Sequence, residues 1–198
     1  MRILVETTPR EDLARLDDAW AAPESFLFLP GRGAHSRAWV EQALAQLPDT
    51  LAHDHFALLT SGSTGRPKIV VGRKARADAL ARALHGLQDL DACAATLLAL
   101  PLPYCFAFVN QWRWARALDR RLIATGGFAE PEALRTSLAD ARDAMLCLVG
   151  AQMPLLDGIA GADTFPGVTR VNFAGGRFPQ EKLSRLREIF PAARVFNN

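Results

Sequence analysis

The sequence contains few cysteines and no long apolar segment, and both shortages restrict the class of protein. Cys93, Cys105 and Cys147 form neither a Cys-x-x-Cys pair nor an even-numbered disulfide framework. Each lies inside or beside an apolar run, so we expect three buried free thiols in a reducing cytoplasm. No apolar run approaches the roughly 20 residues that a membrane-spanning helix needs, and the N-terminus lacks the apolar core of a signal peptide. We therefore expect a cytoplasmic protein without a membrane partner.

Lysine is scarce too, and the net charge is small. Arginine and lysine together number 23, of which Lys68, Lys74 and Lys182 are the lysines, and 21 acidic residues leave a formal net charge of +2. The arginines are dispersed along the chain, so neither the charge nor its distribution indicates a nucleic-acid partner. A chain of 198 residues with 49% hydrophobic content can bury roughly 70% of its unfolded surface. We expect one globular domain spanning residues 1–198.

Apolar runs alternate with helical periodicities along the chain. Short strands are expected over residues 2–5 and 25–29, each followed by an amphipathic helix, and Ser36 can cap the second of these helices. A further amphipathic helix is expected over 74–87. Later runs are apolar on both faces, as in strands of a buried parallel sheet, and lie at 95–100, 122–124, 144–149 and 168–173. The sequence predicts an α/β fold with helices packed on a mostly parallel β-sheet.

A hydroxyl-rich loop with two glycines separates two apolar runs near residue 60. Its hydroxyl groups can donate hydrogen bonds to an anion, while its glycines allow positive φ and a close approach of backbone N–H groups. These residues are Thr60, Ser61, Gly62, Ser63, Thr64 and Gly65. Lys68 follows with a compact positive charge. The pattern predicts a phosphate-binding loop, and the alternative is an ordinary polar turn without a ligand.

The residues after this loop distinguish it from a Walker loop. A Walker loop has four residues between its glycines and opens a helix at its lysine, whereas here two residues separate the glycines. Pro67 disfavours helical backbone at the residue before it, and the β-branched residues at 69–71 favour a strand. We therefore expect paired or neighbouring strands at 56–60 and 68–72, an exposed loop between them, and no helix starting at Lys68.

The segment from Thr60 to Lys68, T-S-G-S-T-G-R-P-K, resembles the [ST]-S-G-[ST]-T-G-x-P-K signature of the adenylate-forming, AMP-binding superfamily. That superfamily contains acyl- and aryl-CoA ligases, adenylation domains that load carrier proteins, and luciferases. Every fixed position of the signature matches. The resemblance implies that the intact protein uses ATP to activate a small-molecule carboxylic acid, forming an acyl adenylate and pyrophosphate. It also implies that this loop holds the β- and γ-phosphates, with Lys68 as the catalytic residue that clamps their charge.

Three shorter segments resemble the same family in the expected order. The segment at 100–104, L-P-L-P-Y, is similar to the family's L-P-[LM]-[FY]-H, which helps to shape the acyl pocket, but it ends in tyrosine where histidine is common. The turn at 174–179, A-G-G-R-F-P, is similar to S-G-G-A-P-L, whose backbone lines the adenine and acyl pocket. The final V-F-N-N resembles the lead-in to N-x-Y-G-x-[ST]-E. The pocket residues implied by these segments are Tyr104, Gly175, Gly176, Arg177 and Asn197.

The family's later elements have no match in the chain, and the portion before Thr60 is short. We therefore expect part of the large N-terminal domain of an adenylate-forming enzyme, either an ordinary one or an unusually compact relative, that is inactive by itself and has its Mg²⁺ ligands outside this chain. The acyl acceptor would be CoA or the thiol of an acyl-carrier protein. One rival is a nucleotide hydrolase or kinase, which the absence of a lysine followed by Ser or Thr disfavours. The other is a degenerate domain that binds nucleotide or a protein partner without catalysis.

Two further patterns have structural explanations. His53 and His55 would share one face of a strand, but no third ligand lies at metal-binding spacing, so no metal site is predicted. The segment at 111–116, Q-W-R-W-A-R, interleaves aromatic and basic residues and could stack on nucleic-acid bases. We interpret it instead as an amphipathic helix whose tryptophans pack while its arginines extend to solvent.

Overall fold

The computed structural model describes the chain except for residues 33–35, 62–66, 177 and 198. The described residues form two compact units, each with its own sheet. Unit 1 comprises Met1–Ala79 with Leu102–Cys105, and unit 2 comprises Leu80–Pro101 with Phe106–Asn198. The interpretation of residues 1–198 as a single domain stays a prediction.

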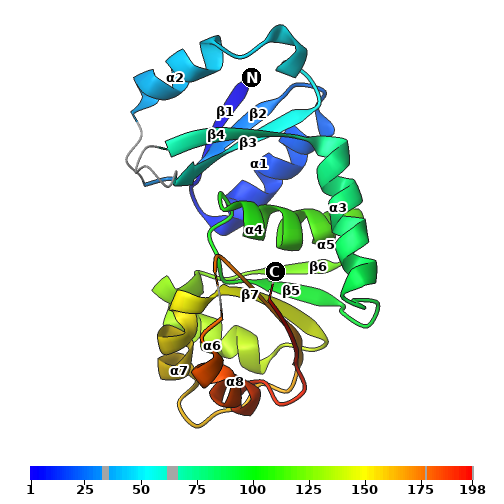
Figure 1. The fold of residues 1–198 in the computed structure, drawn as a ribbon, viewed down its shortest axis with the longest axis vertical. Coiled ribbons are helices and arrows are strands. Elements are labelled where there is room, and N and C mark those ends of the chain that lie inside the picture. Colours follow the sequence, from blue (N-terminus) through cyan, green and yellow to red (C-terminus); the bar gives the residue numbers. More distant parts are fainter. Residues whose placement is uncertain (33–35, 62–66, 177, 198) are drawn as a thin grey trace. The chain divides into compact units, whose positions relative to one another are not determined.

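The sheet of unit 1 has four strands in the order β1-β2-β3-β4 (Figure 1). The first three, β1 (Arg2–Val5), β2 (Phe26–Leu29) and β3 (His55–Ser61), are parallel to one another. The last, β4 (Pro67–Arg73), runs antiparallel to β3. The strands expected before residue 60 therefore form, and the strand expected after the loop forms as well.

Two helices cover opposite faces of this sheet. In α1 (Pro9–Ala21), which has proline in its first turn, the Trp20 ring packs against the rings of Phe26 and Phe56. In α2 (Arg37–Ala45), Val40 belongs to the apolar cluster on the other face. The Ser36 side chain accepts a hydrogen bond from the Trp39 N–H at 3.2 Å, which confirms the predicted cap. A short 3₁₀ turn, η1 (Asp49–Leu51), leads into β3.

The sheet of unit 2 has five parallel strands in the order β6-β5-β7-β8-β9. The strands are β5 (Ala95–Leu98), β6 (Arg121–Ala124), β7 (Ala144–Val149), β8 (Val168–Ala174) and β9 (Arg194–Asn197). The first four lie at the apolar runs of the sequence. The inner strands β5, β7 and β8 are mostly buried, as in a parallel sheet covered by helices, whereas the edge strands β6 and β9 are partly exposed. The prediction of helices on a mostly parallel sheet is confirmed.

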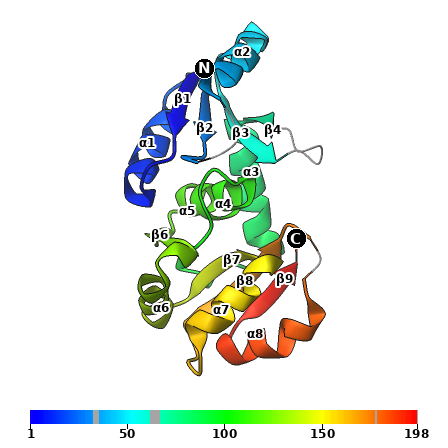
Figure 2. The same ribbon diagram turned by 90° about the vertical axis from the view of Figure 1, so that its left-hand side faces the viewer.

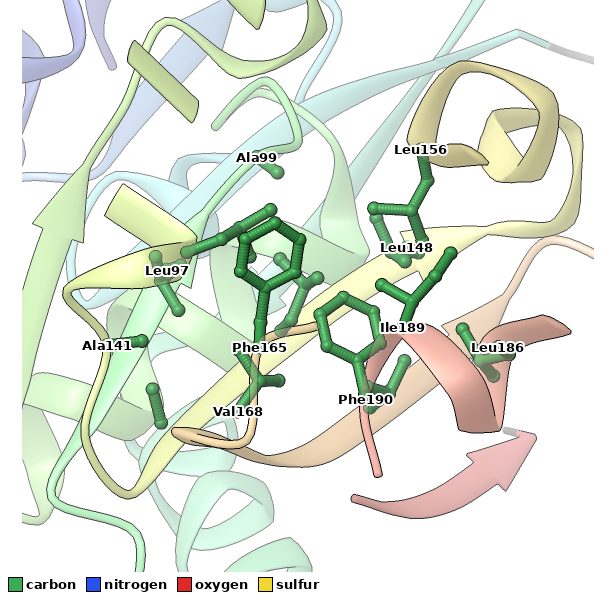
Figure 3. Packing of buried hydrophobic residues seen from close by; sticks show 14 of the residues in the cluster. Leu97, Ala99, Ala141, Leu148, Leu156, Phe165, Val168, Leu186, Ile189 and Phe190 are labelled. Carbon is green, nitrogen blue, oxygen red and sulfur yellow. The ribbon is translucent and has the colours of Figure 1, made fainter. Parts of the chain in front are cut away.

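One face of the sheet in unit 2 carries an extensive apolar core (Figure 3). Leu97, Leu148 and Val171 of the strands pack there against Leu156 and Leu186 of the helices. The helices on this side, which Figure 2 shows together, are α6 (Pro131–Ala139), α7 (Met153–Ala160) and α8 (Leu183–Ile189). Short 3₁₀ turns precede them, namely η3 (Gly127–Ala129), η4 (Gly150–Gln152) and η5 (Gln180–Lys182).

The remaining helical segments begin with α3 (Lys74–Leu87), which starts directly after β4. Farther along the chain, α4 (Cys105–Ala107) is followed by a π-helix, η2 (Phe108–Arg113), and by α5 (Trp114–Ala117). The tryptophans of this stretch are buried as predicted. Arg113 is also buried, with its guanidinium 4.7 Å from the Trp112 ring centre, so the expectation that this arginine extends to solvent was wrong.

The three cysteines are free thiols, and two of them are buried. Cys93 and Cys147 lie in unit 2, and burial raises the pKa of the Cys147 thiol strongly. Cys105 is exposed, so its predicted burial was wrong. The reason is local, because Cys105 opens a short helix right after a turn instead of continuing the apolar run. Among the described residues, no helix has both the length and the apolar character to cross a membrane.

Substitution of Gly72 tests how closely β3 and β4 pack. A Cβ added at Gly72 would lie 2.6 Å from the Phe56 ring, whereas a Cβ added at Gly86 in α3 would meet nothing within 4 Å. We expect Gly72→Ala to lower the free energy of unfolding by about 1–3 kcal/mol through overpacking. Gly86→Ala should leave it unchanged or raise it by up to about 1 kcal/mol. Urea unfolding of both variants gives the comparison, and equal values would contradict the packing described.

Candidate functional site

The β3–β4 hairpin carries the predicted phosphate loop at its tip. The two strands of 7 residues pair throughout, from His55 with Arg73 at the base to Ser61 with Pro67 at the tip. No helix starts at Lys68, which confirms the predicted order of strand, loop and strand. The loop residues 62–66 lie outside the described part of the chain, so the roles of Gly62, Ser63, Thr64 and Gly65 stay predictions.

β4 has the features of an edge strand with one buried side. Within the described sheet it pairs with β3 alone. Proline has no backbone N–H to donate to a neighbouring strand, so within sheets it is confined to positions such as the first residue of an edge strand. Pro67 occupies that position. Ile69 and Val71 pack against the apolar cluster under α2. Since side chains alternate along a strand, Lys68 and Val70 lie on the opposite face.

Thr60 and Lys68 are the predicted site residues that the structure brings directly together. They are partners in the antiparallel register, and directly opposite residues present their side chains on the same face of the sheet. Thr60 is half-buried and Lys68 is exposed. Among the residues that the structure describes, the Lys68 ammonium makes no hydrogen bond or ion pair. The hairpin thus presents a hydroxyl beside an available positive charge, which is the chemistry that an anionic ligand requires.

The second group of predicted residues lies in unit 2, where β8 and β9 end. Gly175 and Gly176 follow β8 with φ values of 81° and 137°, conformations that favour glycine. Asn197 is the last residue of β9 and is the register partner of Phe173 in β8. Because parallel strands end at the same edge of a sheet, the glycine turn and Asn197 belong to one edge. Arg177 lies outside the described residues, and its predicted role stays a prediction.

A cavity of about 470 Å³ lies beside β9 and α8. This volume falls within the range of about 300–1,000 Å³ that is typical of small-molecule sites. Asn197 contributes to its lining, together with residues that the sequence analysis did not select, namely Phe178, Gln180, Leu183, Arg187, Ala193, Arg194, Val195 and Phe196. An arginine on an amphipathic helix resembles any surface residue in sequence, so nothing marked Arg187 as a cavity residue.

Tyr104, the predicted acyl-pocket residue, is 60% exposed and lies between β5 and α4. It belongs to unit 1, as do Thr60, Ser61 and Lys68, whereas the glycine turn and Asn197 belong to unit 2. The predicted residues therefore fall into two sets, one in each unit. In the described part of the chain, no cluster of three or more His, Cys, Asp or Glu side chains could hold a metal ion.

Comparisons with known proteins find matches among solved structures. No family model matches the chain, and no curated protein matches it. A crystal structure of the nonribosomal peptide synthetase FmoA3 aligns with 99% of this chain at a TM-score of 0.78 and 18% identity. A variant of MenE from E. coli with bound OSB-AMS aligns with 98% at a TM-score of 0.70 and 21% identity. The chain has the fold of adenylate-forming enzymes.

This adenylate-forming fold is matched over part of each solved protein. The chain spans 25% of FmoA3, 48% of MenE and 60% of VinN, a third match with a TM-score of 0.70 and 17% identity. A further match, covering 56% of its chain, is a structure of the N-terminal domain of FACL13 from Mycobacterium tuberculosis. The likeness therefore concerns the N-terminal portion of the fold, as expected from the sequence. At these identities it establishes the fold, and the activity is a separate proposal.

Proposed function

We propose that the intact protein activates a carboxylic acid with ATP. The carboxylate would attack the α-phosphorus in line, giving an acyl adenylate and pyrophosphate. The acyl group would then pass to CoA or to the thiol of an acyl-carrier protein, in a reducing cytoplasm. The observation that carries this proposal is the pairing of Thr60 with Lys68 near the tip of the hairpin. This hairpin bears the signature and lies in the adenylate-forming fold. FmoA3 has been crystallised with AMPPNP and with α-methyl-L-serine-AMP, and VinN with L-aspartate, which supports ATP and an acid as substrates here.

The hairpin would act on the leaving pyrophosphate. Negative charge accumulates there as the bond to the α-phosphorus breaks, and a fixed positive charge nearby lowers the energy of that transition state. Lys68 would supply this charge, while the hydroxyls of Thr60, Ser61, Ser63 and Thr64 and the amides of Gly62 and Gly65 would donate hydrogen bonds. No helix N-terminus contributes here, since β4 begins at Pro67. Phosphate binding would therefore depend on side chains and loop amides.

The remaining predicted residues would contact the adenine and the acid. Gly175, Gly176 and Arg177 would line the nucleotide with their backbone, and Asn197 would contact it from the end of β9. Tyr104 would line the acyl pocket, where its ring and hydroxyl differ from the more common histidine of the family. Mg²⁺ would accompany ATP, but the described residues contain no cluster of His, Cys, Asp or Glu side chains that could hold it.

A second candidate is a domain that binds nucleotide or a partner without catalysis. It is compatible with the observations, because solved structures at 17% to 21% identity establish the fold alone. A kinase or hydrolase with a Walker loop is disfavoured, since such a loop opens a helix and Lys68 lies in a strand. Carboxylate-dependent exchange of pyrophosphate into ATP distinguishes these functions, because it requires reversible adenylate formation.

Lys68→Ala in the intact protein should lower kcat/KM for pyrophosphate exchange by about 10-fold to 150-fold. This range corresponds to about 1.5–3 kcal/mol, the usual worth of a charge-assisted hydrogen bond. The melting temperature should change little, because an exposed lysine contributes little to folding. Lys182→Ala removes another exposed lysine and is the matched control, for which we expect unchanged exchange. If Lys68→Ala and the unsubstituted protein exchange pyrophosphate at the same rate, the hairpin tip is only a turn.

The 198-residue chain by itself should not catalyse exchange, although weak nucleotide binding can persist. The reason is that the family resemblance assigns the Mg²⁺ ligands to later elements, and no cluster of His, Cys, Asp or Glu among the described residues could hold the ion. Preorganised charge at the reacting centre is usually the largest catalytic contribution. The measurement is exchange of labelled pyrophosphate by the purified chain over a panel of aliphatic, aryl and amino acids. Turnover above the no-enzyme background would mean that acidic residues such as Asp54 or Glu181 serve in these roles.

A further inference from the structure

Lys74 is a buried lysine at the junction of β4 and α3. It is 6% exposed, and its ammonium lies among backbone carbonyl oxygens that belong to the end of α1 and the residues after it. The Nζ atom donates to the carbonyls of Ala19 at 2.8 Å, Trp20 at 3.3 Å, Ala22 at 2.6 Å and Glu24 at 3.1 Å. This lysine therefore connects segments that are about 50 residues apart in sequence.

The carbonyl groups around Lys74 explain why an ammonium is stable there. The last carbonyls of a helix have no partner within the helix, and they carry the negative end of the helix dipole. A cation among these carbonyls donates hydrogen bonds to them and also offsets their partial negative charge. Lysine offers three N–H donors to the four carbonyls, so one donor is shared. Removal of the ammonium would leave these buried carbonyls short of donors, which is costly.

Other contacts tie the same end of the hairpin to α1 and β2. The Lys74 backbone N–H donates to the Asp54 carbonyl at 2.9 Å, and the His55 N–H donates to Ser25 Oγ at 3.0 Å. The Phe56 ring packs against the Trp20 ring, with centres 5.5 Å apart. Both strands of the hairpin are thus fixed at the base, beside the end of α1.

The tip of the hairpin is held differently. Val70 is 51% exposed and Lys68 is exposed, on the same face that Phe56 and Gly72 occupy nearer the base. Within the described sheet, the one strand that pairs with β4 is β3. The position of Lys68 therefore depends on its pairing with Thr60 of β3 and on the strand that leads from it to the base. Five strand residues, 69–73, separate Lys68 from Lys74, and the six steps between the two lysines span about 20 Å.

We propose that Lys74 is a positioning residue for Lys68. By fixing the base of β4 on the carbonyl end of α1, the buried ammonium sets where the Lys68 charge and the phosphate loop stand. This inference rests on the proposed function, since it gives Lys74 a part in phosphate binding through Lys68.

The first test measures the position of β4 without any ligand. Amide hydrogen exchange is compared in the 198-residue chain, in Lys74→Met and in Lys182→Met, a control that removes an exposed lysine. We expect hydrogen exchange at residues 69–73 to be at least tenfold faster in Lys74→Met than in the unsubstituted chain, while exchange in β7 stays the same. Lys182→Met should exchange at the rates of the unsubstituted chain. If residues 69–73 exchange at the same rate in Lys74→Met and in the unsubstituted chain, or if β4 and β7 are accelerated equally, Lys74 does not hold β4 locally. If Lys74→Met does not fold, Lys74→Gln is judged by the same comparison.

The second test asks whether Lys74 acts through Lys68. The Kd for Mg·ATP is measured by calorimetry for Lys68→Met, Lys74→Met and the double variant. We expect Lys74→Met to raise Kd at least fivefold in the unchanged background, and less than twofold when Lys68 is already methionine. Equal effects in both backgrounds would contradict a role through Lys68. If the unchanged protein binds no ATP, the proposed function fails, while the exchange comparison still decides whether Lys74 holds β4.

Discussion

The candidate site depends on the antiparallel register between β3 and β4. Side chains alternate along each strand, so a slip of one residue would turn Lys68 to the opposite face and separate it from the Thr60 hydroxyl. The register is set near the base, where Phe56 lies opposite Gly72 and needs the space that a side chain there would fill. It is reinforced on the other face by Ile69 and Val71, which are part of the apolar cluster beneath α2.

The two ends of the hairpin therefore differ, because its base is packed and its tip carries an exposed charge. Apolar packing and the buried Lys74 ammonium act at one end, whereas Lys68 is exposed at the other. A Walker loop gains much of its anion affinity from a helix N-terminus, which is part of the backbone. In the proposed function, the hairpin would instead bind phosphate through one lysine and several hydroxyls. Single side-chain substitutions should consequently have larger effects on phosphate binding here than in a loop supported by a helix.

Much of this fold was predictable from the sequence, because its signals are local. Pro67 and the β-branched residues after Lys68 predict a strand, and the apolar runs predict a parallel sheet, as observed. The division into two units was not predictable, since a buried run looks the same in any sheet. Lys74 was also hidden, because a lysine opening an amphipathic helix resembles a surface residue. Its burial depends on the end of α1, about 50 residues earlier. The glycine turn after β8 was predictable as a turn, whereas its function at a pocket rests on the family resemblance.

The scarcity of lysine allows a direct measurement of the central claim, that Lys68 holds the phosphates of ATP. An amine-reactive acetylating reagent should modify the exposed Lys68 and Lys182 and spare the buried Lys74, and mass spectrometry reports each rate separately. We predict that saturating Mg·ATP slows modification of Lys68 at least fivefold and leaves Lys182 unchanged. Equal modification of Lys68 with and without ATP, under conditions where ATP binding is observed, would contradict the assignment of the hairpin as the phosphate site.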